Sequence, residues 1–429
     1  MTTDATTKNS GVQATDDDQA VEEKAHAARP VEEQAATGPG EERSVPKPQF
    51  TDAEAGAREF PDSSAAARRY NYFKPAKRKQ THYEDVTVDV QPDPRHYLSQ
   101  GWIYGFADGS RGYPLTWTKL KAWGVDKPEP QNGVGTGSQH VEDWPAHGWH
   151  EFRDPNEEWE LTMYRYNANV VRQVNQNIEN ARQAKAFEQW TKNWVHFVQH
   201  NVGAWMHIEH ILGLYVFAAC NRSGPTNMHN TALVINSEHK IRSAQDLALY
   251  NLTLSEEIEG FDGTDHIDAW NNDETWQGAR KVTEALTAID DDWGESMFAT
   301  NVVFEPLIGE LFRSNLVMQA AAANGDYVTP TVIGAAEYDY SQRDLRWTQA
   351  CFGPLVADKE FADHNKQLMQ GWLSKWTEQA LAAARTMQPM WSQPDNKPPR
   401  FEDSLDRAKS RFAGIVSDLG LQTPEELTK

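Results

Sequence analysis

The amino-acid sequence predicts an all-α protein, a bundle of long helices that follows an N-terminal region without helical periodicity. Three observations lead to this fold class. Apolar residues recur with the period of an α-helix from about residue 154 to about residue 389. Breaks that contain Gly or Pro divide this stretch into six or more long segments, and antiparallel helices of such lengths form bundles. The first 66 residues contain no Leu, Ile, Trp or Tyr.

Residues 1–66 are predicted to form a disordered acidic tail. They hold 14 acidic side chains against 6 basic ones. A segment of this composition buries too little apolar area to offset the entropy that it loses on ordering. The N-terminus has no basic stretch that leads into an apolar one, so we do not expect a secretory signal.

Residues 67–150 are predicted to form an extended, aromatic-rich arm and loops for contact with another subunit. Between Arg68 and Lys79, cations alternate with aromatic rings, a pattern that suits nucleic acids. The acidity of the chain favours instead an arm that lies across an acidic partner or across its own body. From about residue 82 the segment is rich in Gly, Pro and aromatics, which is typical of a binding surface or of a locally packed hairpin. The interface candidates are Tyr70, Tyr72, Phe73, Trp102, Tyr104, Trp117 and Trp123.

The helical domain is predicted over residues 151–395, and a C-terminal helical segment over residues 396–429. A central helix is expected from about residue 190, because a wide apolar stripe follows its 3.6-residue period. That stripe consists of Trp194, Val198, Val202, Trp205, Leu212 and Val216. Further long helices are expected over residues 226–257, 292–324 and 366–387, with breaks at residues 223–225, 260–263, 324–325, 353–354 and 388–389.

Composition argues against several classes of function. The 41 Lys and Arg residues face 63 Asp and Glu residues, and the formal net charge of -22 opposes binding to nucleic acid or to anionic membranes. Cys220 and Cys351 are too few for a disulfide framework or a thiolate metal site, so both are expected to be buried apolar side chains. The longest apolar run, residues 211–220, is about half of a membrane span. We therefore expect a cytoplasmic protein with neither a nucleic-acid nor a membrane partner.

One candidate metal site lies on the predicted central helix. His196, His200 and His207 share a stripe, because the second and third are offset from the first by about 40° and 20°. An autonomous metalloenzyme could use them together with a carboxylate from another helix. However, His207 lies roughly 16 Å along the axis from His196, so one ion cannot bind all three. The preferred interpretation is the polar edge of a buried helix that hydrogen-bonds a neighbour.

A helical bundle can also hold a carboxylate-bridged di-iron site, which needs two Glu-x-x-His pairs and two further Glu side chains. Of the 14 histidines, only one in the tail and one in the arm have an acid three residues earlier. Ile241 and Ile308 stand three positions after Glu238 and Glu305, where iron would need nitrogen. We therefore predict no catalytic, cofactor-binding or metal-binding residue in this chain.

Four stretches of the sequence carry a family resemblance. They are Phe152-Arg153-Asp154-Pro155 with Glu158-Trp159-Glu160 and Tyr164; Asn236 to Asp246; Asp292-Trp293 with Glu295, Asn301 and Phe304 to Arg313; and Gln370-Gly371-Trp372-Leu373 with Lys375-Trp376 and Gln388-Pro389. In order and spacing they resemble the β, or small hydroxylase, subunit of the soluble bacterial di-iron monooxygenases, and within that family the propane 2-monooxygenase type. The likeness spans about residues 70–395.

The resemblance implies a ferritin-like helical domain that has lost its iron ligands, in agreement with the histidine positions. It implies a non-catalytic subunit of an α2β2 hydroxylase whose large α subunit keeps the di-iron centre. The other implied partners are a coupling protein and a reductase that carries FAD and a 2Fe-2S cluster and oxidises NADH. The implied reaction inserts one oxygen atom of O2 into a small hydrocarbon, propane to 2-propanol or a related alkane, ether, phenol or toluene. An autonomous metalloenzyme and an interaction protein without a role in oxidation are the alternatives.

Overall fold

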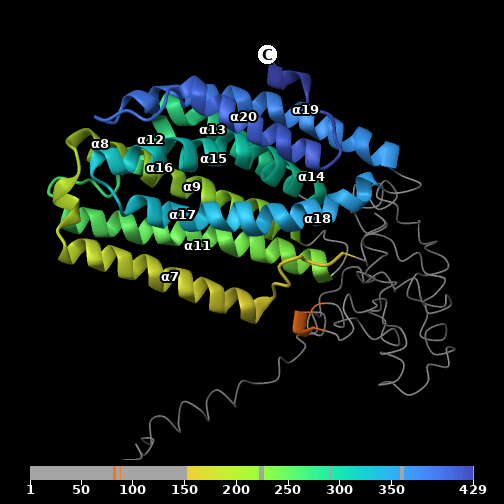
Figure 1. Ribbon diagram of the computed structural model, residues 1–429, viewed down its shortest axis with the longest axis horizontal. Helices are drawn as coiled ribbons and strands as arrows, with labels where there is room; N and C mark the ends of the chain where they lie inside the picture. The colour runs from red at the N-terminus through yellow and green to blue at the C-terminus, as the bar shows by residue number, and fades with distance from the viewer. Residues whose placement is uncertain are drawn as a thin grey trace, which may run out of the picture. The chain divides into compact units, whose positions relative to one another are not determined.

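A computed structural model describes residues 81–83, 87, 152–221, 227–289, 292–357 and 362–428 of the chain (Figure 1). The chain divides into two units, Met1–Lys47 and Pro48–Lys429, and these residues belong to the second. The predicted tail and most of the predicted arm lie outside the described residues. So do all seven interface candidates of the arm, Tyr70, Tyr72, Phe73, Trp102, Tyr104, Trp117 and Trp123.

The described residues fold into helices joined by short turns, and no strand occurs among them, so the all-α prediction is confirmed. Several helices are continuous rods in which α-helical and π-helical turns alternate. The bounds are α7 Glu160–Gln183, η3 Ala186–Gln189, α8 Lys192–Phe197, η4 Val198–Val202, α9 Gly203–Ile211, η5 Leu212–Phe217, α10 Ala218–Cys220, α11 Asn227–Glu257, α12 Asp265–Asn272, α13 Glu274–Thr287, α14 Trp293–Phe298, η7 Ala299–Gly309, α15 Glu310–Phe312, η8 Arg313–Val317, α16 Met318–Ala321, η9 Ala322–Asn324, α17 Thr329–Asp339, η10 Tyr340–Asp344, α18 Leu345–Val356, α19 Ala362–Thr386, η11 Gln388–Ser392, α20 Phe401–Asp418 and η12 Glu425–Thr428.

The predicted central helix is the rod Lys192–Cys220, which runs from α8 to α10. All six side chains of its predicted apolar stripe are buried, none more than 2% exposed. Within the described part of the chain, this is the one helix long and apolar enough to cross a membrane by length and composition, and 56% of its apolar window is buried inside the protein. Core helices meet the same criterion, and the buried stripe makes this rod a core helix.

A second rod, from α14 to η9, is buried even more completely. Every side chain from residue 296 to residue 313 is buried. Its π-helical segment η7 contains Pro306. Proline lacks the amide donor of an α-helix, and its ring crowds the preceding turn. A π-helical stretch, whose hydrogen bonds already depart from the α-helical spacing, tolerates both effects.

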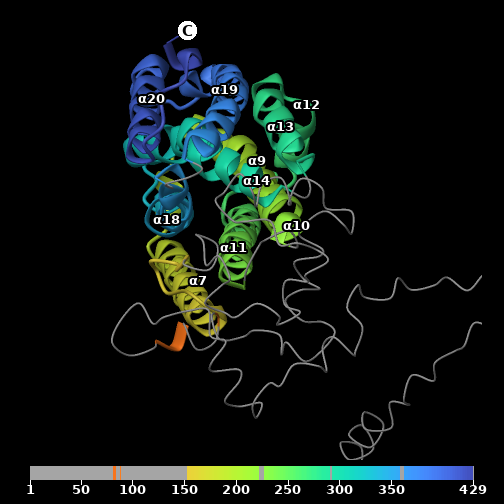
Figure 2. The same cartoon turned by 90° about the vertical axis from the view of Figure 1, so that its right-hand side faces the viewer.

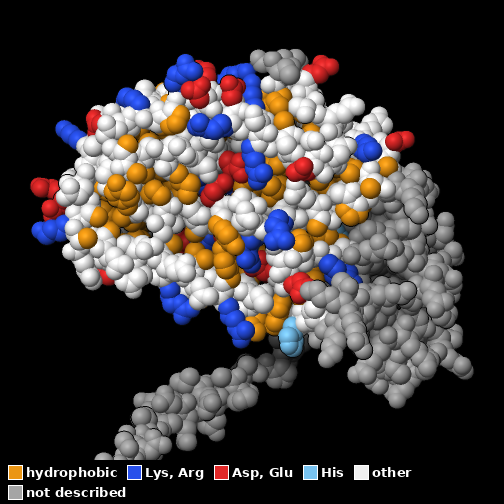
Figure 3. All heavy atoms as spheres, in the orientation of Figure 1, with side chains coloured by type: hydrophobic (Ala, Val, Ile, Leu, Met, Phe, Trp, Pro, Cys, Tyr) orange, Lys and Arg blue, Asp and Glu red, His pale blue; other side chains and the backbone are white. Residues whose placement is uncertain are grey.

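The other helices surround these rods in layers (Figures 1 and 2). α19 and α20 pack against η7 on one side, and α13 packs against α19. α7 lies at the opposite edge, next to α11, which also contacts α9, η5 and α17. On the face shown in Figure 3, basic and acidic side chains are interspersed, so that face offers no basic patch of the kind that binds phosphates.

Most of the predicted breaks that can be compared coincide with helix ends. α11 ends at Glu257 and α12 begins at Asp265, on either side of the break predicted at residues 260–263. Gly325, with a φ of +83°, ends the second rod as predicted. The break at residues 388–389 falls where α19 has ended and the short η11 begins. The break predicted at residues 223–225 lies outside the described residues.

The break predicted at residues 353–354 is wrong, because α18 continues through Gly353 and Pro354 to Val356. Pro354 lies in the last turn of this helix, and its neighbours Phe352 and Leu355 are 0% and 3% exposed. Burial of two large apolar side chains contributes about 1.5–3 kcal/mol each, which offsets one lost hydrogen bond. The helix therefore ends after the proline rather than at it.

The close approach of α13 to α19 at Gly278 leads to a stability prediction. A methyl group at this position would lie 2.3 Å from Thr386 Oγ1 and 2.8 Å from Ala383 Cα. We expect Gly278→Ala to lower the free energy of unfolding by about 1–3 kcal/mol, as overpacking does. In the control Gly371→Ala no atom lies within 4 Å of the new methyl, and helix propensity should raise the free energy of unfolding by about 0.5–1 kcal/mol. Urea unfolding measures both, and equal effects would contradict the close approach.

Candidate functional site

Five charged side chains meet in the interior of the bundle, and we call them the central charge cluster: Glu209, Lys240, Glu305, Arg313 and Glu337. They come from four parts of the fold, α9, α11, the second rod and α17. Four of them are at most 2% exposed, and the side chain of Glu337 is 15% exposed. Buried charges are costly unless they are paired, so this cluster must be neutralised from within.

The two cations of the cluster bridge its three carboxylates. Arg313 Nη2 lies 2.6 Å from Glu305 Oε2, and its Nη1 lies 3.3 Å from Glu209 Oε1. The Nε atom of the same guanidinium lies 2.9 Å from Glu337 Oε2. Lys240 Nζ lies 3.3 Å from Glu209 Oε2 and also pairs with Glu305 Oε1. Each of the two fully buried carboxylates thus contacts both cations.

Opposite charges favour the ionised forms of Lys240, Glu305 and Arg313, although burial opposes charge. Burial lowers the pKa of Lys240, but Glu209 and Glu305 hold it above its ordinary value. Burial raises the pKa of Glu305, but Arg313 and Lys240 hold it below its ordinary value. Burial also opposes the charge of Arg313, and the surrounding carboxylates, Glu305 foremost, hold its pKa well above its ordinary value. Two full positive charges therefore lie in the bundle interior at neutral pH.

Gly309 provides the space for these charges. A methyl group there would lie 2.3 Å from Glu305 Oε2 and 3.1 Å from two guanidinium nitrogens of Arg313. The next residue, Glu310, extends the network, because its Oε1 lies 3.4 Å from Nε of the partly exposed Arg411. Burial and the neighbouring Glu337 carboxylate raise the pKa of Glu310 to about 7. The network thus reaches the protein surface at α20.

The residues of the central charge cluster do not fit a di-iron site. Such a site in a helical bundle takes its ligands from four helices, including two Glu-x-x-His pairs. Three positions after Glu305 and Glu337 stand Ile308 and Tyr340, both fully buried and neither an imidazole. The two cations already pair with the carboxylates and would repel a metal ion. Within the described ranges, no group of three or more His, Cys, Asp or Glu side chains is placed to hold a metal ion.

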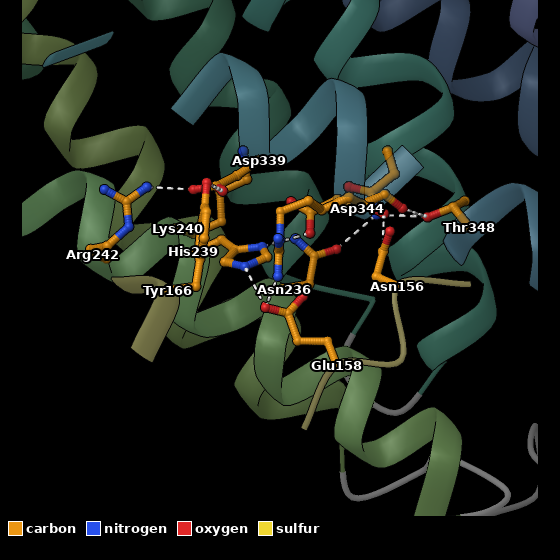
Figure 4. Close-up of polar contacts among 12 residues, drawn as sticks. Asn156, Glu158, Tyr166, Asn236, His239, Lys240, Arg242, Asp339, Asp344 and Thr348 are labelled. Carbon is orange, nitrogen blue, oxygen red and sulfur yellow. Dashed lines mark hydrogen bonds and ion pairs between the residues drawn. The ribbon is translucent and has the colours of Figure 1, made fainter. Parts of the chain in front are cut away.

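A second buried group lies beside Lys240 on α11, and we call it the His239 cluster (Figure 4). His239 Nδ1 lies 2.8 Å from Asp344 Oδ1, and its Nε2 lies 3.8 Å from Glu158 Oε1. Arg343 pairs with the same Glu158. Burial opposes the imidazolium charge, but aspartates, Asp339 first and Asp344 next, hold the pKa of His239 above its ordinary value. This cluster joins the residues before α7 to α11 and η10.

Arg242 extends the polar interior along α11. It pairs with Asp246 one turn further on and with Asp339 of α17. Tyr166 of α7 donates its hydroxyl to Asp339 Oδ1 at 2.7 Å. The Arg343 guanidinium lies 4.1 Å from the centre of the Tyr166 ring, a cation–π contact. These contacts connect α7, α11, α17 and η10.

The stretches that carry the family resemblance meet in these clusters. The first stretch contributes Glu158, and the second contributes His239, Lys240 and Arg242. The third contributes Glu305 and Arg313. The fourth joins the third through Glu295, whose Oε1 lies 2.8 Å from Lys375 Nζ and accepts a hydrogen bond from Trp376 Nε1 at 2.9 Å. Three of the four stretches thus contribute side chains to the buried clusters.

The three histidines of the possible metal ridge lie on the central rod in separate contacts. His200 has both ring nitrogens engaged, with Asp265 at 2.9 Å and Asp273 at 2.8 Å. His207 Nε2 lies 3.0 Å from a ring nitrogen of a histidine on α12. His196 is exposed, and its ring centre lies 5.9 Å from that of His200. His200 and His207 thus hydrogen-bond residues of the neighbouring helix α12, as expected for the polar edge of a buried helix.

Sequence reasoning did not identify the central charge cluster. The sequence offers one signal for such residues, a charged side chain at a position that helical periodicity assigns to the core. Glu305 is an example, because it lies in a mainly apolar stretch that ends at Arg313. Such a signal indicates a buried charge, but it does not name the partner. The partners come from other helices, 65 residues away for Lys240 and Glu305.

The chain is similar to known hydroxylase subunits. Residues 127–359 match the family described as methane/phenol/alkene hydroxylase. The chain is 50% identical to the propane 2-monooxygenase hydroxylase component small subunit of Mycolicibacterium smegmatis, over 90% of this chain and 98% of that protein. It is 26% identical to the methane monooxygenase component A beta chain of Methylococcus capsulatus, over 73% of this chain and 76% of that one.

A solved structure of toluene 4-monooxygenase with bound toluene superposes with a TM-score of 0.55, at 19% identity, over 74% of this chain and 99% of that chain. The expected ferritin-like helical bundle is confirmed.

The central charge cluster leads to a prediction about stability. Lys240→Met leaves the buried carboxylates Glu209 and Glu305 with one cation, so we expect the free energy of unfolding to fall by about 3–5 kcal/mol. As a control, Arg182→Met removes the exposed ion pair with Glu257, with an expected loss of about 0–1 kcal/mol. Urea unfolding of the full chain compares them. If Lys240→Met were as stable as Arg182→Met, Lys240 would not compensate the buried charges of Glu209 and Glu305, and the described pairing would be contradicted.

His207 leads to a prediction about pH. Burial and the neighbouring His266 lower the pKa of His207 from 6.5 to about 4, so the folded state favours the neutral ring. A histidine with a lowered pKa contributes its full stability above the unfolded pKa and loses it as pH falls from 6.5 towards 4. Across this pH window we expect the free energy of unfolding to fall less for His207→Gln than for the wild type. The difference should be on the order of 1 kcal/mol, because the ring is half-buried. Urea midpoints at several pH values test this, and parallel curves would contradict it.

Proposed function

This chain belongs to the methane/phenol/alkene hydroxylase family as the small subunit of a monooxygenase hydroxylase component, and from this membership we propose that it is a non-catalytic β subunit. Non-catalytic means that no residue of this chain binds the substrate or the metal at which oxygen reacts. The proposal assigns the chain a structural role in a complex that oxidises a hydrocarbon.

The observation that carries this proposal is the pair of buried cations in the central charge cluster. In a ferritin-like bundle the ligands of a di-iron centre point inward from four helices. In this chain, Lys240 and Arg313 occupy the interior between the carboxylates that reach it from those helices. The carboxylates therefore pair with side chains of the chain itself, which supports a bundle that folds without metal.

The proposed partner is a large α subunit that holds the di-iron centre, in an α2β2 hydroxylase. The names of the relatives support this partner, since a small subunit and a β chain each imply another subunit. The family resemblance supports the remaining components, a coupling protein and a reductase with FAD and a 2Fe-2S cluster. The reductase would take electrons from NADH, so we place the complex in the cytoplasm.

The proposed reaction is the hydroxylation of a small hydrocarbon, with propane to 2-propanol as the first choice. One atom of O2 enters the C–H bond, and two electrons from NADH together with two protons reduce the other atom to water. Two relatives that are 50% and 49% identical to this chain are named for propane, which supports propane as the substrate. Related alkanes, ethers, phenol and toluene are the other substrates that the family suggests.

Iron content and hydroxylation activity test the proposed function. We expect no bound iron in the full chain purified alone, and about two irons per αβ pair after co-expression with the large subunit. Formation of 2-propanol from propane should require the complex, the coupling protein, the reductase and NADH.

Stoichiometric metal or turnover in the chain alone would overturn this proposal and support an autonomous metalloenzyme. His200→Ala would then show whether the ridge of His196, His200 and His207 holds that metal. A stable complex without any hydroxylation of hydrocarbons would support an interaction protein with no role in oxidation.

A further inference from the structure

Exposed apolar side chains gather on one side of the bundle. Of the ten large hydrophobic side chains exposed within the described part of the chain, seven lie on three neighbouring elements, α7, η5 and α11. They are Leu161, Tyr164, Leu214, Tyr215, Val234, Leu249 and Leu252, and we call this surface the α11 face. α11 contacts α7 as well as α9 and η5, so these elements adjoin (Figure 2). Exposed apolar side chains that gather on neighbouring elements indicate an interaction site.

Four charged or ionisable side chains in the middle of α11 are buried, and several apolar ones are exposed. The buried ones are His239, Lys240, Arg242 and Asp246. The outward positions of α11 recur at intervals of four and three residues, and each is exposed or half-buried. They are Val234, Glu238, Ile241, Gln245, Ala248 and Leu252, and Glu238 is the one ionisable side chain among them. A helix that faces solvent has the opposite pattern, so the outer stripe of α11 has the composition of a covered surface.

Two hollows flank this stripe. One, of about 420 Å³, lies between α11 and the rod α9–η5 and is lined mainly by apolar groups such as Met206, Leu214 and Ile241. His207 lines the same hollow, and its lowered pKa leaves the ring neutral at pH 7. The other, of about 500 Å³, lies between α11 and the start of α7. The α11 face is thus a ridge between two grooves.

The size of the face matches a protein partner rather than a small ligand. The outer stripe runs over 19 residues of α11, or about 27 Å at the helical rise. Neighbouring helices lie about 9 Å apart, so α11 together with α7 and the rod α9–η5 beside it presents on the order of 600 Å². A stable interface buries about 800 Å² on each partner. The α11 face therefore supplies most of one such interface.

We propose that the α11 face docks the large subunit of the hydroxylase, with an apolar helix of that subunit lying along the stripe from Val234 to Leu252. This proposal rests on the proposed function, which requires a large partner. The outward positions are on average 3.6 residues apart, so they form one row along α11, and a helix of the partner is the element that packs along such a row. The near absence of charge on the stripe requires an apolar partner surface.

Binding of the full chain to the tagged large subunit tests this proposal. Leu252→Glu places a charge on an exposed apolar side chain at the C-terminal end of the stripe, and we expect it to weaken the Kd at least tenfold. The control Tyr327→Glu adds the same charge to a side chain that is 74% exposed and lies off the face, and its Kd should stay within about twofold of the wild type. Because both residues are exposed, the thermal midpoints of the isolated variants should match the wild type. A second variant, Leu214→Glu, tests the neighbouring groove in the same way.

The outcomes separate the two proposals. Equal binding by the wild type and Leu252→Glu would overturn the docking surface while the proposed function survives. A wild-type chain that binds no large subunit would remove the proposed function itself. Loss of self-association alone in the Leu252→Glu variant would identify a second copy of the chain as the occupant and overturn the proposal.

Hydroxyl-radical labelling gives an independent measurement. Tyr215, Leu249 and Leu252 should be oxidised in the isolated chain and protected at least threefold in the complex with the large subunit, as expected for side chains within a buried interface. The exposed Tyr327 serves as the internal control, with equal labelling in both states. Protection of the three residues already in the isolated chain would show that another part of the same chain covers the face, and would overturn the proposal.

Discussion

The bundle depends on the pairing of Arg313 with the carboxylates that surround it. A guanidinium that is fully buried has lost its hydration, and only several close carboxylates can compensate for that loss. Glu209, Glu305 and Glu337 provide them from three different parts of the fold. Since each ion pair requires a specific distance, the cluster sets the register in which α9, the second rod and α17 approach each other. Apolar contacts alone would allow these helices to slide.

α11 transmits this constraint to the rest of the molecule. Lys240 joins the central charge cluster, His239 joins the residues before α7 and η10, and Arg242 joins α17. The buried side of α11 holds these charges together with apolar side chains such as Leu233, Leu247 and Leu254. Val234, Leu249 and Leu252 of the same helix are exposed, and they form an apolar surface that a partner subunit can cover.

Under the proposed function, the clusters supply the positive charge that metal ions supply in other ferritin-like bundles. In a di-iron bundle, the metal ions neutralise inward carboxylates from four helices. In this chain a lysine and an arginine provide the positive charge, and Gly309 leaves room for the guanidinium. The π-helical turns of η7 and η8 lie in the same rod as Glu305 and Arg313. Irregular turns of this kind often occur at functional sites, and here they carry the buried charges.

The sequence by itself determined the fold class, the central rod and the lack of paired Glu-x-x-His motifs in the bundle. Periodicity is a local property, so the stripe from Trp194 to Val216 could be assigned to the core without knowledge of its neighbours. The order and spacing of the four stretches also indicated the family. Only the tertiary structure decided which charges pair, because Arg313 and Glu209 are 104 residues apart and no local pattern relates them. It also decided that α18 continues through Pro354 and that Val234, Leu249 and Leu252 of α11 are exposed, since both depend on what each helix packs against rather than on its own propensity.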